Sequence, residues 1–336
     1  MRILRGRSLR HVATVGEVVV EQPTLNLVRI GAAWDRFRKF AYVFRQSRLG
    51  MIGFVILLIF IVVALSAPFL TSGGLLRDPN APLCGTDYHI CRSTDPELQD
   101  LSPPDSRVWL GTDHQGRDIF SRLWWGTQFT VLIGFMASVL SMGLGTFVGM
   151  ISGYYGGWLD EVLMRITDFF LVLPTLVLAL ILSGFFQQSG GGNTWTMVFV
   201  IGISLWSSTA RLVRSQVLSL KQRQFIERAR AVGAGSSRIV WRHIFPNAFS
   251  LVFAEAILTI AVAILTEAFL DYIRLGPQDA NTWGKMIDDA ISHNVIILRL
   301  YWWIVAPGLM IVLVVLGFTL LGYALDEIFN PRLRKR

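Results

Sequence analysis

Long apolar stretches constrain the fold of this chain more than any other feature. Residues 51–70 carry no charge, and their length matches the roughly 20 residues that a helix needs to cross a bilayer core. Because lipid cannot satisfy open backbone groups, only helices and closed barrels span membranes. The sequence therefore predicts an all-α polytopic membrane protein with six transmembrane helices, at 51–70, 127–152, 169–186, 195–210, 246–270 and 300–325.

Composition and charge support this class. Hydrophobic residues make up 53% of the 336 positions and charged residues 16%, which is unusual for a soluble domain. The formal net charge of +8 is typical of some nucleic-acid-binding proteins. Here, however, Lys and Arg lie in blocks between apolar stretches, which is the pattern of a topology signal. We expect membrane lipid, and no nucleic acid, as a partner.

The charge asymmetry predicts the orientation. Residues 1–50 contain ten Lys or Arg against three acidic residues and no long apolar run, so we expect a cytoplasmic tail and no cleaved signal peptide. Aromatic and basic residues alternate over 34–48, as in a helix on an anionic membrane surface. A solvated tail explains 1–30 equally well. The first span is taken as 51–71, an exterior loop as 72–126, the remaining five spans as 127–325, and a cytoplasmic tail as 326–336.

Several spans carry further local signals. Small residues on one face of the second span favour close helix packing, with a transport pathway beside them as the alternative. Pro174 predicts a kink or cap in the third span. The fourth span should extend past Arg211 and Arg214, whose side chains would snorkel, and Trp302 and Trp303 should lie at the membrane interface. The small residues are Ala137, Ser141, Gly145, Gly149 and Gly153.

A polar loop at 221–246 follows the fourth span and should be cytoplasmic. Between 211 and 242 there are eight basic residues and one acid, Glu227. Phe225, Ala229 and Val232 have helical spacing, Gly233 is a turn signal, and a second short helix is expected at 236–245. The loop is longer than ordinary helix connections. We interpret it as a knob that docks a soluble partner; a membrane-surface loop that only reverses the chain is the alternative.

The motif of this loop resembles the EAA loop of permease subunits of ATP-binding-cassette importers. The departures are Arg228, where Ala is usual, and Phe245, where Leu commonly precedes the Pro. The resemblance implies coupling helices that sit in a groove of an ATPase subunit. The residues assigned to this contact are Phe225, Glu227, Arg228, Ala229, Gly233, Ile244, Phe245 and Pro246.

A second motif narrows the resemblance. WLGTDHQGRDIFSRLWWG at 109–126 is similar to the exterior signature of the C-type permease subunit in dipeptide and oligopeptide importers, as are TWG at 282–284 and NPRLR near the end. LDYIRLG at 270–276 replaces the more usual LSFLGLG. The resemblance runs from about residue 45 to 336 and implies a type I importer fold. Its signature residues are Gly111, Thr112, Asp113, Gly116, Arg117 and Asp118.

The resemblance also implies function and partners. We expect a permease subunit that imports dipeptides or oligopeptides across the inner membrane of a prokaryote, with nickel or a glutathione-like compound as alternative solutes. Its partners would be a second permease subunit, two cytoplasmic ATPases and an exterior binding protein. ATP and Mg would bind the ATPases, and this chain would hold no cofactor.

Carboxylates inside spans are costly and often functional. Glu267 matches a family position near the exterior end, where with Trp283 it would shape a gate or pair with a basic neighbour. Glu255 either faces the pathway or hydrogen-bonds a partner helix. Cys84 and Cys91 form a disulfide or stay free thiols, and a metal site there is the weakest alternative.

Other function classes fit poorly. The sequence contains no Walker-type, HExxH or GxSxG motif, and its five histidines are isolated surface residues by pattern. A secondary transporter would show paired halves, an intramembrane hydrolase a buried nucleophile and base, and a channel no long docking loop. We therefore expect a transport subunit and no enzyme.

Overall fold

The computed structural model describes residues 38, 41–72, 76, 78–80, 103–106 and 108–329. The chain divides into two units, Met1–Gln46 and Ser47–Arg336, and in the first the residues at 41–46 are helical. Cys84, Cys91, residues 1–30, residues 34–37, 39 and 40 of the predicted membrane-surface helix, and the end of the tail lie outside the described residues.

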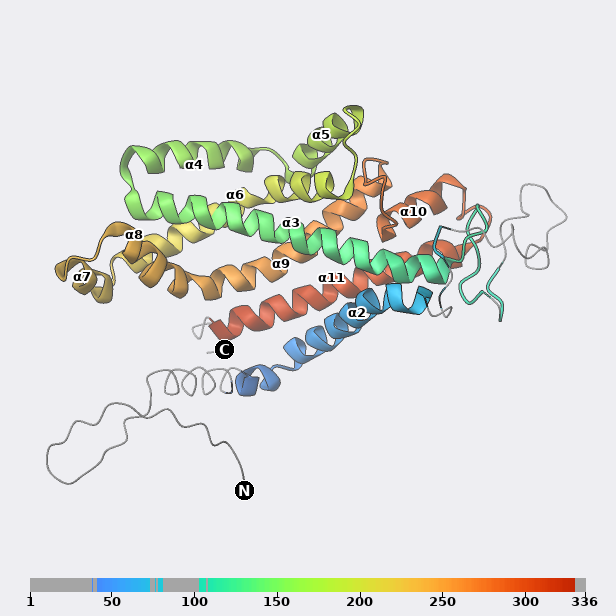
Figure 1. The fold of residues 1–336 in the computed structure, drawn as a ribbon, viewed down its shortest axis with the longest axis horizontal. Helices are drawn as coiled ribbons and strands as arrows, with labels where there is room; N and C mark the ends of the chain where they lie inside the picture. Colours follow the sequence, from blue (N-terminus) through green and yellow to red (C-terminus); the bar gives the residue numbers. More distant parts are fainter. Residues whose placement is uncertain are drawn as a thin grey trace, which may run out of the picture. The chain divides into compact units, whose positions relative to one another are not determined.

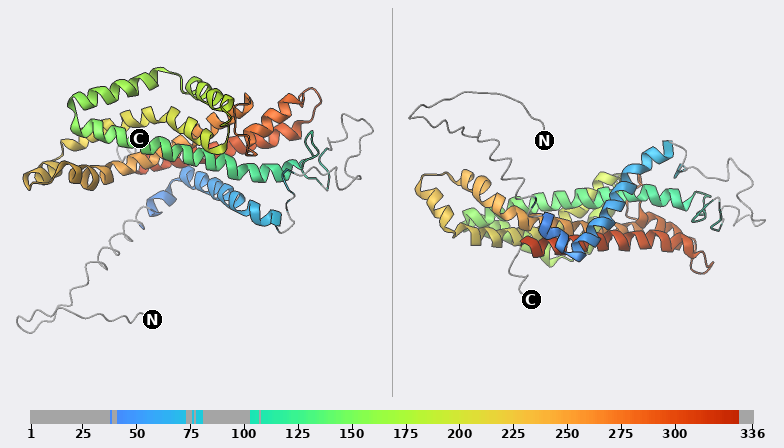
Figure 2. Two further views of the ribbon diagram at one scale, coloured as in Figure 1. Left: turned by 45° about the horizontal axis from the view of Figure 1, so that its top comes forward. Right: turned by 90° about the horizontal axis from the view of Figure 1, so that it is seen from below.

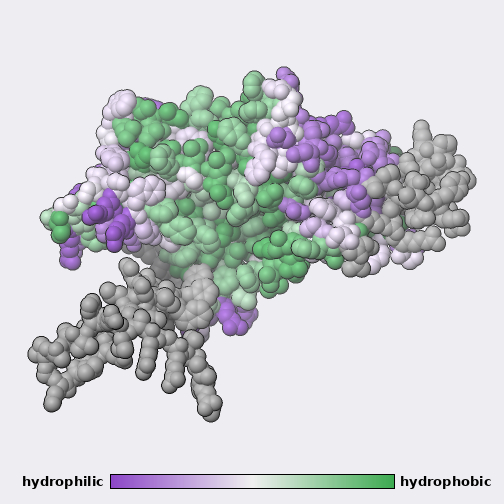
Figure 3. All heavy atoms as spheres, viewed as in Figure 1, coloured by the Kyte–Doolittle hydropathy of each residue, from purple (hydrophilic) through white to green (hydrophobic). Residues whose placement is uncertain are grey.

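The described part of the second unit is almost entirely helical (Figure 1), which confirms the all-α membrane fold. Among the described residues, five helices are long and apolar enough to cross a membrane, and one bent pair brings the number to six if it is a single span. Figure 3 shows apolar surface over the middle of these helices and polar surface near α7 and near α10. The helices are α2 (Arg48–Ser72), α3 (Ile119–Tyr155), α4 (Gly157–Val172), α5 (Thr175–Gln188), α6 (Thr194–Lys221), α7 (Gln224–Ala231), α8 (Ser236–Ile239), the π-helix η2 (Val240–Ile244), α9 (Phe245–Tyr272), α10 (Trp283–Ser292) and α11 (Tyr301–Phe329).

The third span is broken at Pro174, where the sequence predicts a kink or cap, and it begins earlier than the predicted range of 169–186. It consists of α4 and α5, which meet at an angle of 89°. Leu173, the residue before Pro174, is extended with φ −75° and ψ 127°, because the proline ring disfavours a helical conformation at the preceding residue. Most of the segment between the predicted second and third spans belongs to α4.

Two ion pairs fasten α4 to α6, and they use the two arginines expected to snorkel. Arg214 binds Asp160 through both carboxylate oxygens, at 2.7 and 2.6 Å. Arg211 binds Asp168 at 2.5 Å. Both arginines therefore reach across to the neighbouring helix. The extension of the fourth helix past them is confirmed, since α6 continues to Lys221.

Other helix boundaries also differ from the predicted ones. Helix α3 begins at Ile119, inside the predicted exterior loop, because the Asp118 side chain caps it by accepting the Ser121 N–H at 3.0 Å. The second short helix predicted at 236–245 is wrong as a separate element, because Ser236–Tyr272 forms one candidate span. The loop predicted at 271–299 contains α10.

The small-residue face of α3 packs along α6, as predicted (Figure 2). A Cβ atom at Gly145 would lie 2.6 Å from both the Thr209 Cβ and the Trp206 carbonyl oxygen, and one at Gly153 would lie 2.9 Å from the Val217 Cβ. Glycine is therefore required for this approach. Helix α11 packs against α2 and α9.

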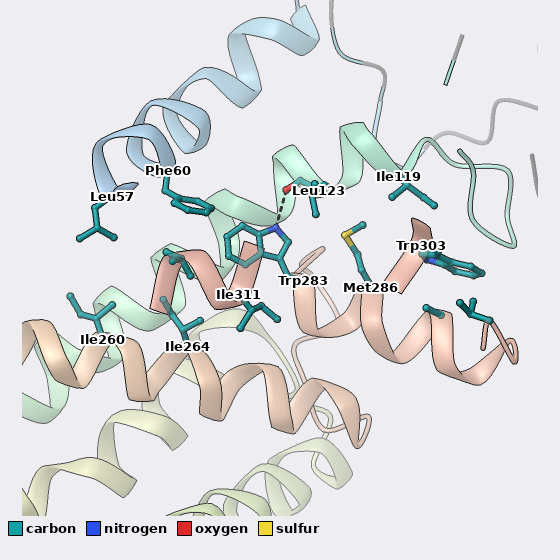
Figure 4. Packing of buried hydrophobic residues seen from close by; sticks show 13 residues of the cluster. Leu57, Phe60, Ile119, Leu123, Ile260, Ile264, Trp283, Met286, Trp303 and Ile311 are labelled. Atoms are coloured by element: carbon teal, nitrogen blue, oxygen red, sulfur yellow. Dashed lines mark hydrogen bonds between the residues drawn. The ribbon is translucent and has the colours of Figure 1, made fainter. Parts of the chain in front are cut away.

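A buried apolar cluster joins α2, α3, α9, α10 and α11 (Figure 4). Trp283 lies at its centre; its ring packs edge-on against Phe60, and its Nε1 donates to the Leu123 carbonyl at 2.9 Å. Trp303 is fully buried in the same cluster. The prediction that Trp303 lies at the membrane interface is therefore wrong, because α10 covers the beginning of α11.

Candidate functional site

Helix α7, with the turn that follows it at 232–235, forms a knob at one end of the helices. Its end is a complete Schellman motif: the Gly233 N–H donates to the Arg230 carbonyl at 2.8 Å and the Ala234 N–H to the Ala229 carbonyl at 3.0 Å. Gly233 has φ +82°, in the left-handed region that glycine adopts without strain. The predicted helix stop is therefore present, and it fixes the direction of the chain after α7.

One buried residue anchors this α7 knob. Ile226 is fully buried in an apolar cluster with residues of α3, α6, η2 and α9, among them Val217 and Ile244. Tyr154 of α3 adds a polar clamp, since its carbonyl accepts from Lys221 Nζ at 2.7 Å and its ring lies under the Arg230 guanidinium at 5.9 Å. The knob is thus attached firmly to three long helices.

The outer surface of the α7 knob carries both apolar and charged side chains. The Val232 side chain is 89% exposed and Phe225 is 40% exposed. Glu227 and Arg228 are also exposed and make no ion pair within the part of the chain that the structure describes. Exposed apolar side chains with unpaired charges beside them are typical of a surface that binds another protein.

A π-helical turn connects the α7 knob to the fifth span. Because Pro246 has no N–H, the regular ladder is interrupted, and the Phe245 N–H donates to the Val240 carbonyl five residues back. Phe245 is half-buried between Trp241 and Phe249, with ring centroids 5.6 and 5.9 Å away. The helix continues from α8 to Tyr272 despite the proline.

The predicted contact residues therefore divide into two groups. Phe225, Glu227, Arg228, Gly233 and Pro246 are exposed. In contrast, Ala229 and Phe245 are half-buried and Ile244 is fully buried, so these three face the protein itself. Ile226 and the exposure of Val232 were not assigned from sequence, although Ile226 is the one large aliphatic residue within the polar helix α7 and signals an anchor.

The predicted exterior signature lies at the opposite end, beside α10 (Figure 1). Gly111 and Gly116 have φ +74° and +68°, so both need the freedom of glycine. Asp113 is fully buried, and its Oδ1 accepts the N–H groups of Gln115 and Arg117 at 2.9 Å each. Thr112 pairs with Asp118 in an isolated bridge, and the loop is thereby closed on itself.

A buried ion network ties this loop to α10. Arg122 donates to Asp113 at 2.5 Å and to Asp289 at 2.9 Å, and Arg117 donates to Asp113 at 2.7 Å. Burial raises the pKa of Asp113, but the charges of Arg122 and Arg117 outweigh it and hold the pKa below the usual 3.8. The sequence motif included Arg122, but its fully buried position and its partner Asp289 emerge only from the fold.

Two histidines also meet here, which corrects the view that all five are isolated. The rings of His114 and His293 stack with centroids 3.8 Å apart, and the Trp303 ring lies 5.7 Å from His114. Burial, followed by the nearby charge of His293, lowers the pKa of His114 below 6.5, although Asp113 and Asp289 oppose this shift.

The predicted gate residues have distinct surroundings. Glu267 is fully buried and lies one turn from Asp271, another buried acid, so its neighbour is acidic and not basic. Thr282, which caps α10, donates its hydroxyl to Asp271. Glu255 is half-buried and makes no side-chain hydrogen bond within the described ranges, so both of its predicted roles stay predictions. No group of three metal-ligating residues occurs among the described residues.

Comparison with known proteins defines the class. Residues 145–335 match the family described as "Binding-protein-dependent transport system inner membrane component", and residues 31–104 match "N-terminal TM domain of oligopeptide transport permease C". The chain belongs to the family of binding-protein-dependent transport permeases. It is a multi-pass membrane protein and a subunit of a transport complex, and the family is not enzymatic.

Curated relatives are similar over most of the chain. The oligopeptide transport system permease protein OppC of Bacillus subtilis is 34% identical over 87% of this chain and 88% of its own length. The dipeptide transport system permease protein DppC of Bacillus subtilis is 30% identical over 94% and 89%. The glutathione transport system permease protein GsiD of Pectobacterium atrosepticum is 38% identical over 69% and 75%.

A solved structure shares the fold. An inward-facing structure of the MetNI methionine ABC transporter matches with a TM-score of 0.50 and 20% identity, over 64% of this chain and 97% of the other. This likeness supports the arrangement of the helices, and it agrees with the predicted type I importer fold.

Proposed function

We propose that this chain is the permease subunit that carries dipeptides or oligopeptides in an ATP-driven importer. The observation that carries the proposal is the similarity to oligopeptide and dipeptide permeases over 86 to 94% of the chain. A second permease subunit would complete the pathway, an exterior binding protein would deliver the peptide, and two cytoplasmic ATPases would bind ATP and Mg.

The α7 knob is the proposed contact with an ATPase subunit, and in this proposal the α7 end would lie in the cytoplasm and the α10 end outside. Its exposed side chains, Phe225, Glu227, Arg228 and Val232, suit a groove that offers apolar surface and acidic groups to match the basic excess of the loop. Ile226 would hold the knob in place during contact.

The connection from the α7 knob to the far end suggests how coupling works. One continuous helix runs from Ser236 to Tyr272, and its last turn holds Asp271, which binds the cap residue of α10. A displacement of the knob by ATPase closure would therefore shift the end near Glu267 and Trp283 as well. Such a lever requires two states whose balance the nucleotide changes.

Reconstitution of the complete importer in proteoliposomes tests the proposal. We expect uptake of a labelled dipeptide or tripeptide that requires ATP, the ATPase subunits and the binding protein, and we expect V232D to weaken ATPase co-purification. R274Q, an exposed substitution at the α10 end, is the matched control and should leave assembly intact. Uptake without ATP, or V232D assembly equal to that of R274Q, would refute the proposal.

A further inference from the structure

A polar crevice opens at the α10 end, apart from the α7 knob. It has a volume of about 590 Å³, within the range of roughly 300–1,000 Å³ that is usual for small-molecule sites. The end of α2, the segment at 78–80, the beginning of α3 and the segment at 278–285 line it. Asn281 donates to Asn80 at 2.7 Å and so links two of these segments.

Lys285 gives the crevice a cation without a direct ion-pair partner in the described part of the chain, although its charge also acts on the buried Asp271. Its Nζ makes only long contacts, of 3.4 Å each, with the carbonyl oxygens of Gln278 and Ala280. Within the described residues, no carboxylate lies within ion-pair distance of it. Arg117 also lines the crevice, but Asp113 and Asp289 already satisfy its guanidinium.

The position of Lys285 does not serve the stability of α10. The helix begins at Trp283, so Lys285 lies in its first turn, where the helix dipole disfavours a positive charge. A cation at this position is useful when an anion lies beside it. The opening of the crevice is where such an anion can reach it.

The remaining walls of the crevice supply negative charge, opposite to that of Lys285, and aromatic surface. Asp279 accepts from the Thr194 N–H and hydroxyl at 2.8 and 2.9 Å, both through Oδ1, and its Oδ2 accepts no hydrogen bond from the described residues. Trp125 and Phe129 form an aromatic wall, and the Trp125 ring is fixed by its 2.9 Å bond to Thr71. Asp78 is a second acid in the lining, so the crevice offers an ammonium, carboxylates and an apolar face together.

We propose that this crevice binds a short peptide with free termini, with Lys285 taking the terminal carboxylate and Asp279 the terminal amine. The assignment rests on the proposed peptide import and makes the crevice a peptide site on the permease itself. The concave shape and moderate volume favour a small zwitterion over a flat contact with the binding protein. A charge-assisted contact of this kind is typically worth about tenfold in affinity.

Uptake of alanyl-phenylalanine and of its C-terminal amide by the reconstituted importer tests this assignment. At limiting peptide concentration, K285Q should lower uptake of the free peptide by about tenfold and uptake of the amide by less than about twofold. K285R should restore uptake of the free peptide. R274Q, whose arginine pairs with Asp288 outside the crevice, should change neither substrate. Co-purification of all subunits shows that each variant assembles.

The possible outcomes separate the crevice from the proposed function. Equal losses for both substrates, together with weaker affinity for the binding protein, would make the crevice a protein-docking surface and overturn the assignment. Free-peptide uptake by K285Q equal to wild type would also overturn it, while leaving peptide import intact. If wild type itself shows no ATP-dependent peptide uptake, the proposed function fails.

Discussion

The buried ion network at the α10 end predicts a large effect of R122M. Methionine keeps most of the aliphatic volume of Arg122 and removes the guanidinium, which donates to Asp113 and Asp289. Because Asp113 is fully buried, Arg117 would then be the one charged partner left to its carboxylate among the described residues. Removing one partner of a buried pair costs roughly 3–5 kcal/mol, so we expect a loss of that size in the free energy of unfolding.

The same α10 helix provides the matched control. Arg274 pairs with Asp288 at 3.3 Å, but its side chain is 69% exposed, so R274M should cost less than about 1 kcal/mol. Equilibrium unfolding of the purified proteins in detergent, followed by tryptophan fluorescence, measures both variants. If R122M and R274M lower the free energy of unfolding by amounts that agree within about 0.5 kcal/mol, burial does not decide how much the Arg122 ion pair stabilises the protein.

The pH dependence gives a second test of R122M. In the wild type the pKa of Asp113 lies below 3.8, so its contribution to stability is present above pH 3.8 and is lost as the pH falls through the lower folded-state value. Without Arg122 the pKa of Asp113 should rise. The stability lost on acidification should therefore be smaller in R122M and complete at a higher pH than in the wild type, and an unchanged acid limb would contradict the network.

Three further predictions follow from single positions. G149L should prevent the close approach of α3 and α6, because a Cβ atom there meets the Ala210 carbonyl. G143L on the same helix is the control, since a Cβ atom there meets no atom within 4 Å. In thermal unfolding, G149L should be less stable than G143L by about 1–3 kcal/mol. I226A should lower the local stability of α7 by about 2–5 kcal/mol, so that amide hydrogen exchange in α7 becomes faster. Exchange as slow as in the wild type would show that Ile226 is not an anchor. The pKa of His114 is lowered, so stability should fall as the pH drops below about 6.5, and H114Q should flatten that slope in pH-dependent melting.

Sequence periodicity anticipated most helices, because apolar length depends on the bilayer and needs no knowledge of neighbours. It also located the small-residue face of α3 and the stop at Gly233, where glycine has a local conformational reason. The exposure of Glu227 and Arg228 was predictable because their polarity is local, whereas the exposure of Val232 was not. The inward orientation of Ile244 was not, since the continuation of the helix through Pro246 depends on a π-turn.

The amino-acid sequence by itself determined that the chain spans a membrane through helices and carries a basic, polar knob, because hydropathy and charge act on each segment alone. Only the tertiary structure decided which charges meet. Arg211 and Arg214 find Asp168 and Asp160 because the 89° bend lays α4 against α6, and Arg122 finds Asp289 because α10 folds back onto α3. Trp303 is also buried because of the tertiary structure, since the neighbouring helix α10 covers it.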